Sequence, residues 1–388
     1  MPAKPQFDMR GILRLPNLTD LAKAALPGGT LLRSLRTLHG GGDRPSRPVA
    51  RGDVPGLGTV ADHLTATPAM RELLDRFATF KPGAGLCGMT VPAGSRAAPA
   101  LPEGARFEAF TFRGGGREMA YKLYVPSTYG SQALPLVVML HGCTQSPDDF
   151  AAGTRMNEIA EEQGVLVAYP GQAASANAQK CWNWFDAKDQ HRDHGEPALI
   201  AGLTREVMRD FAVDPARVYV AGLSAGGAAA AIVAQAYPDI YAAAGVHSGL
   251  ASGAATDMPS AFAAMRQGGI PRSGGRTGRP VPTIVFHGDR DRTVHPSNGE
   301  HVLTQAKAGA ALTTTVTRGE AAGGLSYTRT VQSDGAGSPT LERWVLHGAG
   351  HAWSGGSQAG SYTEPRGPDA SREMLRFFLA HANSEVAA

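Results

Sequence analysis

Short, continuous apolar runs alternate with segments of helical periodicity over most of the chain, and this alternation constrains the fold most strongly. The runs lie at residues 136–140, 165–169, 218–221, 241–247 and 283–286. Segments that are apolar at nearly every position suit strands buried on both faces of a parallel sheet. We therefore predict an α/β fold with a mostly parallel central sheet and helices on both faces.

The expected sheet begins with an antiparallel hairpin. Residues 107–113 and an alternating apolar pattern from Met119 to Val125 flank the turn at Gly114–Gly116. Expected helices cover roughly residues 148–163, 198–211, 225–236 and 299–308, and the chain closes with a strand at 341–346 and a helix at 371–382. We find no internal repeat with a period of about 20–50 residues, which excludes solenoids and propellers.

The first hundred residues differ from the rest, because short apolar patches there are separated by Gly/Pro-rich stretches. We expect residues 1–104 to form a loosely structured N-terminal extension, partly helical or disordered, before a main domain at 105–388. Residues 31–38 and 70–77 have the spacing of amphipathic helices. They would pack on the main domain, stay partly disordered, or dock to an apolar polymer or membrane surface, and the sequence leaves these alternatives open.

Composition excludes several classes of partner. The formal net charge is +3 and basic residues are scattered, so no nucleic-acid footprint is expected. No run of about 18 apolar residues exists, so no membrane-spanning helix is expected. We see no ordinary secretory signal, so a cytoplasmic location is the default expectation. The three cysteines, Cys87, Cys143 and Cys181, lack metal-ligand spacing, and we expect no metal site.

The segment Gly222-Leu-Ser224-Ala-Gly226 follows an apolar strand and precedes a helix rich in small residues. This strand, turn and helix form the context of a nucleophile elbow, in which the serine occupies a strained turn and the two glycines remove clashing Cβ atoms. A plain tight turn is the alternative. The context favours Ser224 as a nucleophile at a helix N-terminus, where developing negative charge is stabilised.

A serine hydroxyl needs a histidine base and a carboxylate that orients the histidine. After an elbow, the acid is expected beyond a later strand and the histidine beyond the last one. Asp291 and His351 occupy these places. Asp289 is the rival acid, although its position in the turn suits a bond to local backbone. His347, at a strand end, is expected to be structural.

Acyl transfer also requires two N–H donors for the developing oxyanion. We expect them to be the backbone groups of Ala225 and Cys143, the latter in the loop that follows the strand at 136–140. The alternative is that His141-Gly142 merely ends that strand.

Two aromatic segments lie near the expected site. We expect Trp182 and Trp184, in a polar loop, to bind hydrophobic or aromatic ester chains together with Trp353, with a packing role as the alternative. A disulfide between Cys143 and Cys181 would pin the oxyanion loop to this aromatic loop.

Five ordered motifs together resemble the esterase family of polyhydroxybutyrate depolymerases, which is itself similar to feruloyl and acetylxylan esterases. They are H-G-C-T-Q at 141–145, C-W-N-W-F at 181–185, G-L-S-A-G-G at 222–227, H-G-D-x-D-x-T-V-H-P at 287–296 and G-H-A-W-S-G-G at 350–356. The resemblance implies an α/β-hydrolase esterase domain without a metal or organic cofactor. Many relatives are secreted, so an extracellular location is the alternative to the cytoplasmic one.

The residues and the resemblance together lead to one expected reaction. The chain should hydrolyse carboxylic esters through an acyl-enzyme, with hydroxyalkanoate polyesters or oligomers as substrates. A feruloyl or acetylxylan esterase is the alternative. Readings from other classes are an oligopeptidase or acyltransferase with the same triad, and a non-catalytic polymer-binding protein.

Overall fold

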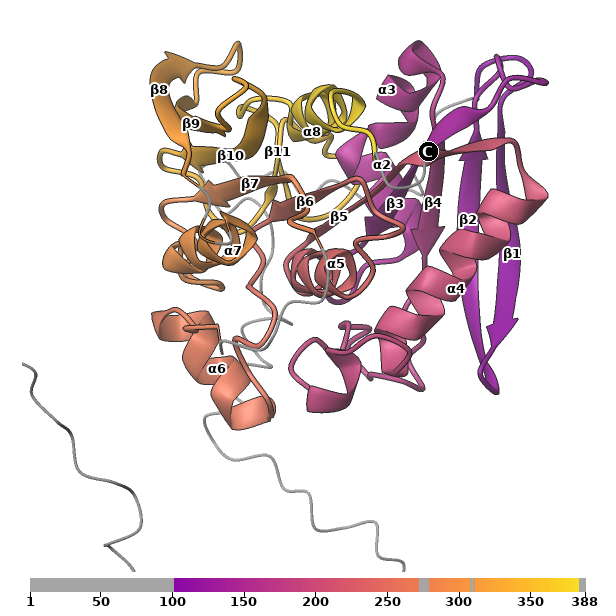
Figure 1. Ribbon diagram of the computed structural model, residues 1–388, viewed down its shortest axis with the longest axis horizontal. Coiled ribbons are helices and arrows are strands. Elements are labelled where there is room, and N and C mark those ends of the chain that lie inside the picture. Colours follow the sequence, from indigo (N-terminus) through magenta and orange to yellow (C-terminus); the bar gives the residue numbers. More distant parts are fainter. Residues whose placement is uncertain (1–100, 272–278, 308, 310, 384–388) are drawn as a thin grey trace, which may run out of the picture. The chain divides into compact units, whose positions relative to one another are not determined.

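The computed structural model describes residues 101–271, 279–307, 309 and 311–383. The expected extension, including both amphipathic patches, lies outside the described residues except for residues 101–104. The described residues build a ten-stranded sheet in the order β1-β2-β4-β3-β5-β6-β7-β10-β9-β8 (Figure 1). The strands are β1 (Arg106–Gly114), β2 (Arg117–Val125), β3 (Leu134–Leu140), β4 (Leu166–Pro170), β5 (Val213–Leu223), β6 (Ala243–His247), β7 (Thr283–Gly288), β8 (Thr313–Glu320), β9 (Ser326–Ser333) and β10 (Pro339–Leu346).

The centre of the sheet is parallel and both of its ends are antiparallel. Strands β4, β3, β5, β6, β7 and β10 run parallel to one another, whereas β1 and β2 at one end and β9 and β8 at the other pair antiparallel. Every residue of β4, β6 and β7 is buried. The apolar runs are therefore buried parallel strands, which confirms the predicted sheet.

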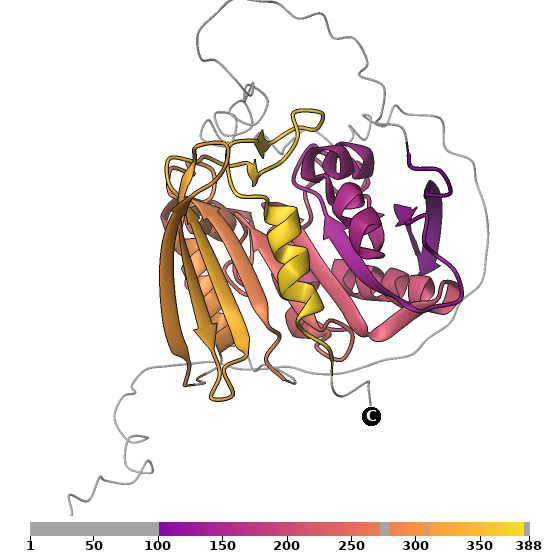
Figure 2. The same cartoon turned by 90° about the horizontal axis from the view of Figure 1, so that it is seen from above.

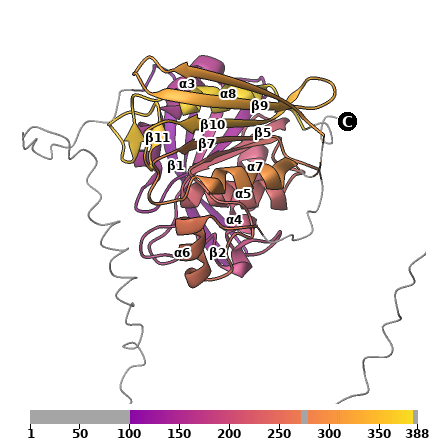
Figure 3. The same cartoon turned by 90° about the vertical axis from the view of Figure 1, so that its left-hand side faces the viewer.

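Helices cover both faces of the sheet. On one face lie α2 (Pro147–Thr154), α3 (Met156–Gln163) and α8 (Ala370–Leu379), and on the other lie α4 (Gly195–Asp210), α5 (Ala225–Ala236) and α7 (Ser297–Lys307). Figure 3 shows α3 and α8 on one side of the strands and α4, α5 and α7 on the other. Helix α8, yellow in Figure 2, lies over the middle strands β5, β6 and β7. The prediction of helices on both faces is thus confirmed.

The structure corrects the helix expected over residues 148–163. Arg155 has a positive φ of 57° and divides the segment into α2 and α3. The hydroxyl of Thr154 donates to the carbonyl of Phe150 at 2.8 Å, a local bond that competes with helix continuation. The apolar periodicity continues across the break, so the sequence pattern alone does not reveal it.

Helix α6 (Met258–Gln267) and the hairpin of β8 and β9 have no counterpart among the expected elements, and neither have the short paired strands β11 (Trp353–Ser354) and β12 (Thr363–Glu364) or the 3-10 turn η1 (Ala187–Asp189). Helix α6 begins at a capping box between Asp257 and Ser260 but buries only Ala261 and Ala264. The hairpin of β8 and β9 extends the sheet beyond β10, although β8 is almost wholly exposed. An exposed, threonine-rich strand such as β8 has no apolar alternation, so it lacks the usual sequence signal of a strand.

Replacing Phe378 should test how α8 is held on the sheet. Its ring is fully buried and stacks on Tyr219 of β5 with ring centroids 5.0 Å apart. Phe378→Ala should lower the free energy of unfolding by about 3–5 kcal/mol, because it removes a large side chain from a packed core. Urea denaturation followed by circular dichroism measures this loss. As a control, Leu379→Ala at the half-buried neighbouring position should lower the free energy of unfolding by less than half as much. Equal losses in the two variants would contradict this packing.

Candidate active site

Four neighbouring strands bring the candidate residues to one edge of the sheet. Strands β5, β6, β7 and β10 are parallel and adjacent, so their carboxyl ends lie together. Ser224 directly follows β5, His247 ends β6, Asp291 lies three residues after β7, and His351 lies five residues after β10. This is the edge at which open α/β sheets hold their ligands.

Ser224 occupies a strained turn between β5 and α5. Its φ of 57° and ψ of −118° lie outside the regions that ordinary residues prefer. Its N–H donates to the carbonyl of His247 at 2.9 Å. A Cβ at Gly222 would collide with the Gly226 carbonyl, and a Cβ at Gly226 would collide with the Leu140 carbonyl. Both glycines are therefore required by the close approach of α5 to β3 and β5.

Asp291 and His351 form a buried hydrogen bond. Nδ1 of His351 lies 2.7 Å from Oδ2 of Asp291, whose side chain is fully buried. Oδ1 of Asp291 accepts the N–H groups of Thr293 and Val294 at 2.8 and 2.9 Å. These bonds fix the carboxylate, and the carboxylate fixes the imidazole with Nε2 on the side opposite Asp291.

A second histidine contacts the same carboxylate. Nε2 of His287 lies 3.4 Å from Oδ2 of Asp291 and 2.9 Å from the carbonyl oxygen of Val294. Burial alone would raise the pKa of Asp291, but the charge of His351 and hydrogen bonds from both histidines hold that pKa well below its usual value. Asp291 is therefore an anion that can stabilise a histidinium at position 351.

The loop after β10 is tied back to His247, which pairs with Leu223, the residue directly before Ser224. Nε2 of His247 accepts the N–H of Ser354 at 3.0 Å, and its ring stacks on Trp353. Since the carbonyl of His247 also accepts the N–H of Ser224, His247 links the serine turn to the loop that carries His351. His247 is a residue of the site that was not predicted from the sequence, although its place at the end of the apolar run at 241–247 was a usable signal.

Asp289, the rival acid, lies apart from His351. Its carboxylate accepts the N–H of Gly348 at 2.7 Å and lies 2.9 Å from Nδ1 of His347. Both side chains of this pair are about 40% exposed, at 39% and 42%. Asp289 therefore holds the turn after β10, and His347 is its partner there.

The loop after β3 leaves one backbone donor available among its described neighbours. The N–H of Gly142 donates to Oε1 of Gln145, that of Thr144 to the carbonyl of Gln179, and that of Gln145 to the carbonyl of Gly142. The N–H of Cys143 has no such partner within the described residues. At the start of α5, Ala225 follows Ser224 and presents one of the helix's unpaired N–H groups.

A disulfide joins Cys143 to Cys181, with Cα atoms 4.2 Å apart. The expected link between the oxyanion loop and the aromatic loop is therefore present. Beneath the aromatic loop, the carboxyl of Glu196 accepts the backbone and side-chain N–H groups of Asn183, both at 2.7 Å. Burial and the nearby charge of Asp189 raise the pKa of Glu196 to about 7. No local sequence pattern marks Glu196 as a buried carboxyl.

The structure corrects the expected binding role of Trp182 and Trp353. These two side chains are 0% and 1% exposed, so they pack inside the protein and offer no surface to a ligand, whereas Trp184, at 6%, is about as exposed as Ser224 and His351. The indole N–H of Trp182 donates to the carbonyl of His141 at 3.0 Å. Trp353 packs edge-on against Phe150. The aromatic cluster in a polar loop was misleading because Trp182 and Trp184 point inward and join the main hydrophobic core.

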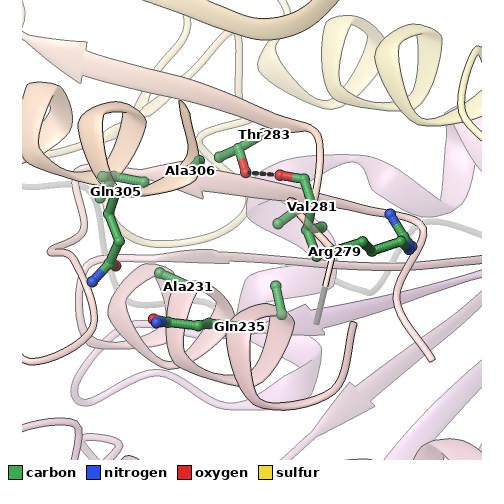
Figure 4. Close-up of a pocket in the computed structure, with 10 residues that line it drawn as sticks. Ala231, Gln235, Arg279, Val281, Thr283, Gln305 and Ala306 are labelled. Atoms are coloured by element: carbon green, nitrogen blue, oxygen red, sulfur yellow. Dashed lines mark hydrogen bonds between the residues drawn. The ribbon is translucent and has the colours of Figure 1, made fainter. Parts of the chain in front are cut away.

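A small cavity elsewhere in the described part of the protein is not lined by Ser224, Asp291 or His351. The cavity in Figure 4 has a volume of about 40 Å³ and lies between α5 and α7, near the start of β7. Its lining includes Ala231, Gln235 and Thr283, and the hydroxyl of Thr283 donates to the carbonyl of Val281 at 2.9 Å.

Within the described part of the chain, no cluster of His, Cys, Asp and Glu could hold a metal ion, and no helix is long and apolar enough to cross a membrane.

The sheet order and the serine turn define the chain's described part as an α/β-hydrolase. An acetyl xylan esterase from Aspergillus awamori has the same fold, with a TM-score of 0.56, 19% identity, and coverage of 71% of this chain and 99% of that one. The family model described as "Esterase PHB depolymerase" matches residues 119–323, more than half of the 388 residues. The chain belongs to this esterase family.

Individual relatives carry several names. The chain is 34% identical to poly(3-hydroxyalkanoate) depolymerase C of Paucimonas lemoignei, over 59% of this chain and 57% of that protein. It is 30% identical to feruloyl esterase B of Thermothelomyces thermophilus, over 47% of this chain and 67% of that protein. The match to the depolymerase thus spans little more than half of that relative's length.

The serine turn should be intolerant of a single methyl group. Alanine normally stabilises a helix by about 1 kcal/mol relative to glycine. Gly226→Ala should instead lower the free energy of unfolding by at least about 3 kcal/mol, since its Cβ would meet backbone carbonyls. Chemical denaturation measures this change. Gly130→Ala is the control, because open space surrounds that position, and a normally stable G226A protein would contradict the close approach.

Proposed function

We propose that the protein is a serine carboxylic-ester hydrolase with Ser224 as nucleophile, His351 as general base and Asp291 as the orienting acid. The observation that supports this most directly is the 2.7 Å bond between His351 and the buried carboxylate of Asp291. It lies at the sheet edge that also carries the strained Ser224. Ser224 and His351 keep 8% and 7% of their surface exposed, so a substrate can reach them.

The reaction proceeds in two displacements. Oγ of Ser224 attacks the ester carbonyl carbon while Nε2 of His351 takes the hydroxyl proton, and Asp291 stabilises the resulting imidazolium. The carbonyl oxygen becomes an oxyanion that accepts the N–H groups of Cys143 and Ala225. His351 then returns its proton to the departing alkoxide, and the alcohol leaves. A water molecule, deprotonated by His351, attacks the acyl-enzyme, and the acid product leaves as Ser224 recovers its proton.

We propose hydroxyalkanoate polyesters or their oligomers as the substrate class. The depolymerase of Paucimonas lemoignei supports this choice because it has the highest identity among the relatives compared above. Feruloyl or acetylated glycans are the second candidate, supported by feruloyl esterase B and by a probable acetylxylan esterase A of Aspergillus clavatus at 26% identity.

We also propose that the protein works outside the cytoplasm. The disulfide between Cys143 and Cys181 supports this, since disulfides persist in oxidising compartments and are rare in reducing ones. This favours the extracellular alternative over the default expectation of a cytoplasmic enzyme.

Parallel assays of the purified full chain test both reaction and substrate. Hydroxybutyrate polymer and oligomers should be hydrolysed faster than a feruloyl ester or acetylated xylan, and a fluorophosphonate should label Ser224. Ser224→Ala should lower kcat by at least about 10³-fold, because the acyl-enzyme can no longer form. Preferential cleavage of a peptide amide would favour an oligopeptidase. Absence of both turnover and label would favour a non-catalytic binding protein.

The two aspartates form a matched pair for testing the acid. Asp291→Asn should lower kcat by about 10³–10⁴-fold, because an amide cannot hold the correct tautomer or stabilise an imidazolium at His351. Asp289→Asn should change kcat by less than about tenfold, because the Asp289 side chain is partly exposed and bonds His347 and Gly348 in the turn after β10, not His351. Steady-state kinetics on one soluble ester measure both. Equal losses, or a larger loss at Asp289, would contradict the assignment.

A further inference from the structure

We propose that His141 is a positioning residue that aims the N–H of Cys143 at the substrate's carbonyl oxygen. The inference rests on the proposed function, since it concerns the oxyanion site of that reaction. His141 touches neither the nucleophile's proton nor the reacting atoms. It acts through the peptide group that joins Gly142 to Cys143.

That peptide group couples an acceptor to a donor. The carbonyl of Gly142 and the N–H of Cys143 belong to one planar trans peptide, so they point in opposite directions and rotate together. The carbonyl is held by Nδ1 of His141 at 2.7 Å and by the N–H of Gln145 at 3.4 Å. Anchoring the oxygen therefore fixes the direction of the N–H on the other side.

The hydrogen bond at Nε2 of His141 determines which of its two ring nitrogens carries the proton. Nε2 of His141 lies 3.0 Å from the backbone nitrogen of Gln172, which is a donor, so Nε2 must accept. The proton is then on Nδ1, where it is donated to the carbonyl of Gly142. Burial lowers the pKa of His141 to about 4, so the ring remains neutral in this tautomer at neutral pH.

The imidazole is itself rigidly held. His141 is 1% exposed, and its own carbonyl accepts the indole N–H of Trp182 at 3.0 Å. The side chain of Gln172 donates to the carbonyl of Cys181 at 3.0 Å. Cys181 in turn is bonded to Cys143 through the disulfide. The ring thus joins the oxyanion loop to the loop that contains Trp182, and a donor on such a support needs no reorganisation when charge develops.

Three substitutions separate the two nitrogens. The side-chain amide of His141→Asn can occupy the place of Nδ1 and donate to Gly142, but it is too short to reach Gln172. The longer His141→Gln can reach Gln172 but places no donor at Nδ1. His141→Phe keeps a ring and removes both bonds. As a control, His381→Phe removes another histidine with backbone partners, at Phe377 and Pro339, which lies outside the proposed site.

The measurements are kcat, KM, the affinity for a boronic acid that mimics the tetrahedral intermediate, and the thermal midpoint of each full-length variant. His141→Gln and His141→Phe should lower kcat by at least about tenfold and weaken boronic acid binding similarly, with KM changed by less than about threefold. His141→Asn should retain most of the kcat and of the boronic acid affinity that His141→Gln and His141→Phe lose. His381→Phe should lower the thermal midpoint without lowering kcat.

Several outcomes would overturn the proposal. Folded His141→Gln with wild-type kcat and boronic acid affinity would show that Nδ1 does not aim the donor. His141→Asn as slow as His141→Gln would show the same, and this pair decides the matter if His141→Phe does not fold. A loss of kcat that only tracks the thermal midpoint, as gauged by His381→Phe, would reduce His141 to a structural role. If the wild type neither hydrolyses esters nor labels at Ser224, the proposed function fails instead.

Discussion

The close approach of helix α5 to the ends of β3 and β5 determines the geometry at this edge of the sheet. Gly226 lies where a methyl group would meet the carbonyls of Leu140 and His141, and Gly222 lies where one would meet Gly226. This contact places the start of α5, with Ser224 and Ala225, directly against the loop that carries Cys143. Both proposed oxyanion donors and the nucleophile are therefore positioned by one backbone contact between glycine-bearing segments.

Buried histidines organise the rest of the site. His141, His247, His287 and His351 are all less than a tenth exposed, and each bonds groups in the loops at this edge of the sheet. His141 supports the oxyanion loop, His247 joins the serine turn to the loop after β10, and His287 shares the carboxylate of Asp291 with His351. Only the last combines a carboxylate partner with some exposure to substrate, which suits it to move a proton.

Sequence reasoning succeeded where a local pattern carries the physical constraint. A buried parallel strand must be apolar throughout, so the strands of the central sheet were visible as continuous runs. The glycines around Ser224 were visible because only glycine tolerates that turn. It failed where contacts decide the outcome: Trp182 and Trp353 were expected at the surface but are buried, and the exposed hairpin of β8 and β9 carries no apolar signal.

The sequence by itself determined the sheet type and the serine turn, because these depend on residue type and local spacing. It offered the roles of Ser224, Asp291 and His351 and the pairing of Cys143 with Cys181 as hypotheses, because these residues lie far apart in the chain. Only the tertiary structure decided which aspartate meets His351, which histidines are supports, and where the tryptophans point. Those outcomes depend on contacts between separate segments of the chain, such as Asp291 and His351, which lie 60 residues apart. Such contacts are set by how strands align in the folded sheet, which no local pattern records.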